Sequence, residues 1–153
     1  MSIPKILLPY NFSSLDQKAV SFAVQMFKHM EGAEVTVFHA YTPLPGIEIR
    51  AGNITEKMKG SMRHLSQQLI EQENILNAVA TNLSQSGFPN RAGAMFKPRK
   101  KDIANEIIET AREMQVEFIV LNRKHERITR FFSGSVSQKV ITTLKNTNIC
   151  IVT

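Results

Sequence analysis

The sequence predicts an α/β domain built on one doubly wound, five-stranded parallel sheet with helices on both faces. Short apolar segments alternate along the chain with longer segments whose apolar residues recur at helical spacing. Because a helix separates each strand from the next, the strands cannot form tight hairpins and are expected to pair in parallel, with right-handed crossovers. The 153 residues suit a single domain, 1–153, with its own core.

The first half of the chain predicts two strands and two helices. Residues 3–9 are short and apolar, and residues 34–40 are rich in β-branched side chains, as expected for strands. Between them, residues 11–14 (NFSS) offer N-cap residues for a helix that extends to Met30, with Gly32 as its stop. A loop at 42–54 precedes a long helix at 55–86. One apolar stripe on this helix predicts core packing along its length: Met58, Met62, Leu65, Leu69, Leu76, Val79 and Leu83.

The second half continues the alternation. Strands are predicted at 91–97, 116–121 and 148–152. A helix containing Ile103, Ile107, Ile108 and Ala111 lies between the first two, and a helix from 134 to 144 precedes the last. Cys150 falls inside the last apolar strand and is predicted to be a buried core thiol.

Composition narrows the class of protein. No apolar run is long enough to span a bilayer, and the N-terminal segment lacks the pattern of a secretory signal. We therefore expect a soluble cytoplasmic protein. A single cysteine excludes an internal disulfide framework and a cysteine-based zinc site.

The net charge of +6 is concentrated in two basic runs. Residues 91–101 contain five bases and no acid, and residues 123–130 contain four bases and one acid. Such runs are typical of solvated loops. Nucleic-acid binding is a weaker hypothesis, because the chain lacks a nucleic-acid motif and aromatic residues are not interleaved with the run 97–101.

In a doubly wound sheet, ligands bind beyond the carboxyl ends of the strands, where the winding reverses. The loops expected there are 10–14 and 122–135. Gly134-Ser135-Val136 opens a helix, whose free N–H groups and positive dipole end attract anions. A simple N-cap by Ser133 or Ser135 explains the same residues, and both interpretations remain open.

Several enzyme classes lack their essential residues. The chain contains no Walker A, G-x-G-x-x-G or G-x-S-x-G pattern. It also lacks the acidic residues that a response-regulator receiver carries after its first and third strands. The four histidines are too far apart in sequence to suggest a metal motif, and His39, at the end of the second strand, is predicted to be a hydrogen-bonded structural histidine.

Four segments together resemble the universal stress protein family. They are KILLPYNFS near the start, EVTVFHA, DIANEIIETAREMQVEFIVLN, and FFSGSVSQKV followed by NICIV. The resemblance covers nearly the whole chain, and its most specific part is the Gly-Ser-Val-Ser helix start before a final apolar strand. It implies the adenine-nucleotide α-hydrolase-like fold of that family, a cytoplasmic homodimer that pairs through residues 148–152, and a role in stress tolerance.

One branch of that family binds ATP through Gly, two residues, Gly, about nine residues, then Gly-Ser or Gly-Thr. Here only Gly134-Ser135 matches this pattern. Counted forward from the end of the fourth strand, the two earlier glycines fall on Asn122 and His125; counted back from Gly134, they fall on Leu121 and Lys124. Residues 121–125 contain no glycine. Two further departures are Asn11, where ATP-binding members carry an aspartate, and Ala40, where a larger aliphatic residue is common. Asparagine has no charge and adds a donor.

The sequence therefore favours a non-enzymatic regulatory homodimer with weak or absent nucleotide binding and no required cofactor. One alternative is an ATP-binding signalling protein with a remodelled phosphate loop, in which arginine or lysine replaces backbone contacts to ATP or to a small phosphate-type anion. The other alternative is a nucleic-acid binder that uses the two basic runs. The candidate nucleotide or anion site comprises Asn11, Ala40, Asn122, Arg123, Lys124, Arg127, Gly134, Ser135 and Val136; no catalytic or metal-binding residue is predicted.

Overall fold

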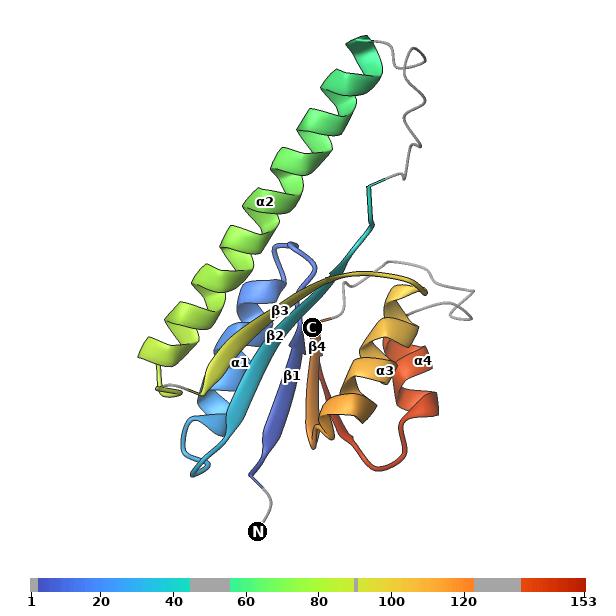
Figure 1. The fold of residues 1–153 in the computed structure, drawn as a ribbon. Helices are drawn as coiled ribbons and strands as arrows, with labels where there is room; N and C mark the ends of the chain where they lie inside the picture. The colour runs from blue at the N-terminus through green and yellow to red at the C-terminus, as the bar shows by residue number, and fades with distance from the viewer. Residues whose placement is uncertain (1–2, 45–55, 90, 123–135) are drawn as a thin grey trace.

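A computed structural model describes residues 3–44, 56–89, 91–122 and 136–153. Five parallel strands form one sheet in the order β3-β2-β1-β4-β5 (Figure 1). The strands are β1 (Lys5–Pro9), β2 (Glu34–Tyr41), β3 (Ala92–Pro98), β4 (Phe118–Asn122) and β5 (Asn148–Val152). The predicted fold class and strand positions are confirmed.

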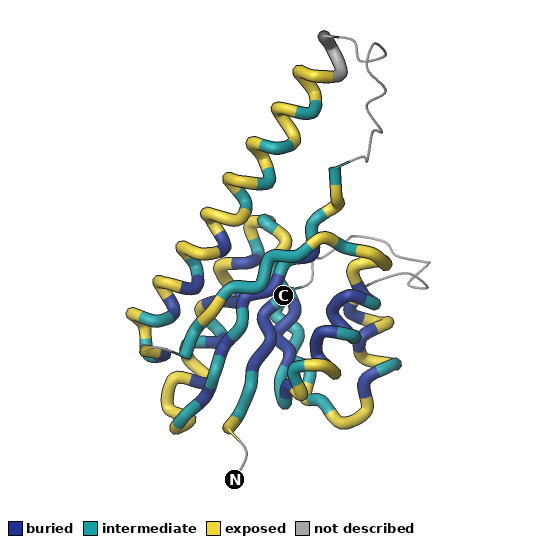
Figure 2. The backbone as a smooth tube through the Cα atoms, in the orientation of Figure 1, coloured by how far each residue is buried: buried dark blue, intermediate teal, exposed yellow. Residues whose placement is uncertain are grey.

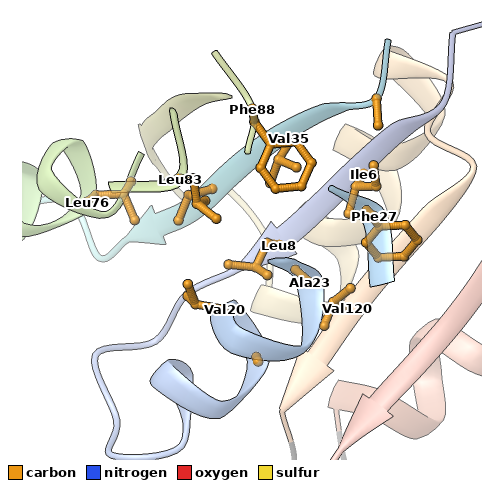
Figure 3. Packing of buried hydrophobic residues seen from close by; sticks show 13 residues of the cluster. Ile6, Leu8, Val20, Ala23, Phe27, Val35, Leu76, Leu83, Phe88 and Val120 are labelled. Atoms are coloured by element: carbon orange, nitrogen blue, oxygen red, sulfur yellow. The ribbon is translucent and has the colours of Figure 1, made fainter. Parts of the chain in front are cut away.

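Two helices cover each face of the sheet (Figure 1). On one face lie α1 (Asp16–Phe27) and α2 (Glu56–Gln85), and on the other lie α3 (Ile103–Met114) and α4 (Val136–Thr143). Because successive side chains of a strand point to opposite faces, Ile6 and Leu8 pack toward α1 and α2, while Leu7 packs toward α3 and α4. The core is therefore divided into two clusters by the sheet. Figure 3 shows Leu76 and Leu83 of α2 in the first cluster together with Val20 and Ala23 of α1.

The start of α1 differs from the prediction. The helix begins at Asp16, after an N-cap residue, Leu15, that makes no side-chain cap bond. The polar residues at 11–14 form the preceding turn, in which Phe12 has a φ of 60°. The carboxylate of Asp16 accepts hydrogen bonds from the backbone N–H groups of this turn and so ties the turn to the first residue of the helix.

The prediction that the whole apolar stripe of α2 is core is wrong for its N-terminal half. Leu76 and Leu83 are buried, whereas Leu65 is 38% exposed and Met62 and Leu69 are only partly buried (Figure 2). The cause is length. A 30-residue helix is about 45 Å long, but the longest strand has 8 residues and spans only about 27 Å.

Cys150 is only partly buried, contrary to prediction, because β5 lies at the outer edge of the sheet, where β4 is its one strand partner among the described residues. Among the described residues, no helix is long and apolar enough to cross a membrane.

Candidate functional site

The winding of the sheet reverses between β1 and β4, and two predicted site residues meet at that point. Asn11 follows β1, and Asn122 is the last residue of β4. The side-chain amide of Asn11 donates to Oδ1 of Asn122 at 3.5 Å. Two segments separated by 111 positions in sequence are thus joined across the carboxyl ends of the strands, where a ligand is expected in this fold class.

A third residue, Asp16, completes this contact and was not predicted. Its side chain is buried, with 1% of its surface exposed, in the first turn of α1. Oδ1 accepts from Nδ2 of Asn122 at 2.5 Å and from the backbone N–H of Asn11 at 3.3 Å. Oδ2 accepts from the backbone N–H of Ser13 at 2.7 Å. Both oxygens are therefore occupied by donors from within the protein.

The electrostatics of Asp16 reflect two opposing effects. Burial raises the pKa of its carboxyl group above the usual value, and the hydrogen bonds from Ser13, Asn11 and Asn122 partly offset that rise. The turn after β1 consequently wraps around an anion supplied by the chain itself. Its backbone N–H groups at Asn11 and Ser13 point to this internal carboxylate.

An aromatic cluster lies beside this turn. The ring of Phe12 makes edge contacts with Tyr10 and His39, at centroid distances of 5.1 and 4.7 Å. His39 also stacks on Phe96, which in turn stacks on Tyr41. These contacts hold Phe12 in its left-handed backbone conformation, which is uncommon for a bulky residue.

His39 has the structural role predicted from the sequence. Its Nδ1 donates to the carbonyl oxygen of Tyr10 at 2.7 Å, which ties the end of β2 to the end of β1. Burial lowers the pKa of the imidazole, against smaller opposing effects from that hydrogen bond and from Asp16. The lowered pKa favours the neutral form of the ring.

Ala40 does not join the contact between Asn11 and Asn122. It is buried in the second core cluster, with Leu7 and Phe38, on the face covered by α3 and α4. Asp16 belongs to α1, on the opposite face. Arg123, Lys124, Arg127, Gly134 and Ser135 lie outside the described residues. Val136 is the first residue of α4, consistent with the predicted helix start.

The first basic run, 91–101, is engaged with acidic and polar residues of the fold. Lys97 pairs with the buried carboxylate of Glu106 at 3.3 Å, and Lys101 pairs with Glu109 at 3.1 Å. Oε1 of Glu106 also accepts from the backbone N–H groups of Lys100 and Lys101, at 2.8 and 3.0 Å. Most of this run is strand β3, and its end at 99–101 is a turn before α3 that Glu106 holds in place. The second run, 123–130, lies outside the described residues.

Within the described residues, no group of three or more histidine, cysteine, aspartate or glutamate side chains is placed to hold a metal ion. The chemistry available at the carboxyl ends is that of hydrogen bonding and charge: two asparagines, one internal carboxylate and an aromatic surface.

Comparison with known proteins identifies the family. The universal stress protein family profile matches residues 2–147. This chain belongs to the universal stress protein family. Its sequence has no significant match among curated proteins.

Solved structures of universal stress proteins share the fold. UspA from Lactobacillus plantarum superposes with a TM-score of 0.69 at 15% identity, over 100% of this chain and 99% of that one. The Archaeoglobus fulgidus universal stress protein in complex with dAMP has a TM-score of 0.61 at 20% identity, over 99% and 98% of the two chains. A universal stress protein family protein from Arabidopsis thaliana with AMP bound has a TM-score of 0.62 at 11% identity, over 97% and 90%.

Proposed function

We propose that this universal stress protein is a non-enzymatic, cytoplasmic regulatory homodimer in the stress response, and that it binds adenine nucleotides weakly or not at all. The observation that carries the nucleotide part is the internal carboxylate of Asp16. It occupies the backbone N–H groups of Asn11 and Ser13 and the amide of Asn122. A nucleotide entering at this point has to displace or rearrange these bonds before it gains its own.

The second candidate is an ATP-binding protein with a remodelled phosphate loop. The neighbours that hold dAMP and AMP favour it, and so do the cationic residues Arg123, Lys124 and Arg127. Calorimetric titration of the natural protein with ATP, ADP and AMP distinguishes the two. Binding weaker than about millimolar supports our proposal, whereas micromolar or tighter ATP binding overturns it in favour of the second candidate. Nucleic-acid binding is the weakest candidate, because Lys97 and Lys101 are paired within the fold.

The dimer part rests on the edge position of β5. This strand pairs with β4 on one side only, and its four apolar residues are all partly exposed. An unpaired strand edge recruits other strands. The backbone N–H of Asn148 points to β4, where it donates to the carbonyl oxygen of Glu117. Since successive residues of a strand alternate, the N–H groups of Ile149 and Ile151 point to the open edge.

This alternation permits a specific test of the dimer. Ile151→Pro removes an outward N–H without removing a bond to β4, and proline is tolerated at such edge positions. Ile151→Ala is the matched control, because it removes the same side chain and keeps the N–H. We expect the natural protein and the alanine variant to associate at micromolar concentration and the proline variant to sediment as a smaller species than either. A monomeric natural protein contradicts the proposal, and a proline variant that sediments like the alanine variant contradicts the β5 assignment.

A further inference from the structure

The N-terminal half of α2 extends beyond the domain. Figures 1 and 2 show this half of the helix standing clear of the sheet, and no side chain between residues 59 and 75 is buried. The buried residues of the helix, Leu76, Ala80 and Leu83, are all in its last third. Twenty residues, 56–75, thus extend about 30 Å past the point where the helix meets the core.

The projecting half carries the same apolar seam as the packed half. Met62, Leu65, Leu69, Gln72, Leu76, Val79 and Leu83 follow one another at alternating spacings of three and four residues. This is the a/d repeat of a coiled coil. Its last three members pack on the sheet or beside its core, so the first four present the same helix face to whatever lies beyond the sheet edge.

A helix of this composition is marginal without a partner. Most helical stability in proteins comes from packing of an apolar face rather than from intrinsic propensity, and this segment packs on nothing described and contains Gly60, which lies in open space and weakens a helix interior. Leu65, Ile70 and Ile75 are 38%, 59% and 46% exposed. A surface that covers the seam would remove the exposed part of Leu65 from water and stabilise the helix.

We propose that the partner is α2 of a second copy of this chain, packed antiparallel on the projecting half. The repeat sets the register, because antiparallel coiled coils place a residues opposite d residues. Leu65 then faces Leu69 of the second copy, and Met62 faces its Gln72. The two helices overlap over residues 59–75, within the projecting length, so each folded domain lies at an opposite end of the pair.

Charge selects the antiparallel orientation. The early part of the projecting half is basic, with Lys59 and Arg63, and the later part is acidic, with Glu71 and Glu73. With Met62 and Leu69 at a positions of the heptad, residues 59, 66 and 73 are the e positions that flank the seam. In the antiparallel register e positions of one helix meet e positions of the other, which brings Lys59 of each copy to Glu73 of the other. A parallel pair would place like charges at the same level and both domains at the same end. Opposite flanking charges set orientation in coiled coils.

The cross-linking test uses two adjacent positions in a Cys150→Ser background. Ser66 occupies an e position close to its own symmetry mate in the antiparallel register, whereas Gln67 occupies an f position on the far side of the helix. We expect a short thiol-to-thiol cross-linker to join copies of Ser66→Cys and not of Gln67→Cys. A parallel pair places the two Ser66 positions on opposite flanks, where they are not joined.

Two further variants in the Ser66→Cys background exclude nonspecific association. Leu65→Glu places a charge in the seam, and we expect at least a tenfold loss of cross-linked product. Ile70→Glu removes a more exposed apolar side chain that lies off the seam, and we expect no loss. Lys59→Glu and Glu73→Lys should each reduce the product, and the double variant should restore it.

Three results overturn the proposal: no cross-link at position 66, equal cross-linking at 66 and 67, or equal loss with Leu65→Glu and Ile70→Glu. The first is also the outcome if another segment of the same chain, or a different protein, covers the seam. The readout at position 66 is independent of any dimer formed through β5.

Discussion

Replacing Asp16 with asparagine tests the internal carboxylate directly. The carboxylate accepts three hydrogen bonds, from Ser13, Asn11 and Asn122. An asparagine at this position offers one oxygen and one NH₂ group. If its oxygen replaces Oδ1, it keeps the bonds from Asn11 and Asn122, but its NH₂ then faces the N–H of Ser13, which is left with a 3.3 Å bond to Oδ1 of Asn11. If its oxygen faces the N–H of Ser13 instead, its NH₂ faces the N–H of Asn11 and the side chain of Asn122. Asn122 can rotate its amide to present an oxygen, but the backbone N–H of Asn11 then has no acceptor.

The expected cost is that of one unsatisfied donor, about 1–3 kcal/mol in the free energy of unfolding at pH 7. For a chain of this size, each kcal/mol lowers Tm by about 2–4 °C. Urea unfolding measures the difference. Asp102→Asn is the matched control: Asp102 is the N-cap of α3 and accepts from the N–H of Asn105 at 2.8 Å. Asparagine is an equally good N-cap, and the ion pair that Asp102 makes with Lys139 at 3.1 Å is exposed, so this change should cost less than Asp16→Asn.

The pH dependence of the Asp16→Asn effect has a definite sign. Burial raises the pKa of Asp16 above 3.8, more than its hydrogen bonds lower it. The folded state then holds the proton more tightly than the unfolded state, so the natural protein loses stability as pH rises from 3.8 through the raised pKa. Asp16→Asn has no such loss, and the stability gap between the two should narrow over this window and stay constant above it. A gap that widens, or no gap at pH 7, refutes the reasoning.

The remaining predictions concern Glu106 and the two halves of the candidate phosphate site. Burial acts to raise the pKa of Glu106, but the backbone N–H groups of Lys100 and Lys101 and the ammonium group of Lys97 outweigh it and hold the pKa below its usual value. Glu106→Gln should therefore lower the free energy of unfolding by about 1 kcal/mol at pH 7. This cost, measured by urea unfolding, should shrink as pH falls below 4.5. The amides of residues 134–137 should shift in NMR spectra during a phosphate titration at low ionic strength, and no shift up to tens of millimolar means that Gly-Ser-Val-Ser is only a helix cap. Asn11→Asp combined with glycines at Asn122 and His125, or at Leu121 and Lys124, should strengthen ATP binding in calorimetry. If ATP binding is not strengthened, these positions do not explain the weak affinity.

The fold could be predicted because its signals are local. Apolar strands such as 116–121 and the helical spacing of Ile103, Ile107 and Ile108 are properties of short segments, and strict alternation leaves a parallel sheet as the arrangement that fits. The packing of α2 could not be predicted in the same way. The spacing of Met62, Leu65 and Leu69 indicates an apolar helix face, but only the short strands of the folded sheet determine where that face runs out of core.

Asp16 was missed because its burial is a tertiary effect. In sequence it is an ordinary acidic residue in the first turn of a helix, where such residues are favoured and usually exposed. Its side chain becomes buried because the turn at 11–13 folds back over it and because Asn122, 106 positions away, reaches it. The positive φ of Phe12 makes that turn possible, and no local pattern at phenylalanine predicts it. The signal that could have drawn notice is an aspartate so soon after the first strand.

The positions of Asn11 and Asp16 together bear on nucleotide binding. With asparagine at 11, the described residues at the reversal of the sheet provide one carboxylate, and it is turned inward rather than toward a ligand. The side chains of Asn11 and Asn122 already bond to each other. A nucleoside hydroxyl that binds here exchanges one hydrogen bond for another, and such an exchange contributes little net free energy. Affinity must then come from phosphate contacts beyond residue 122, and the helix dipole at an exposed α4 terminus supplies only about 0.3–1 kcal/mol of it. We therefore expect that changing the first loop alone, as in Asn11→Asp, raises ATP affinity less than changing both loops together.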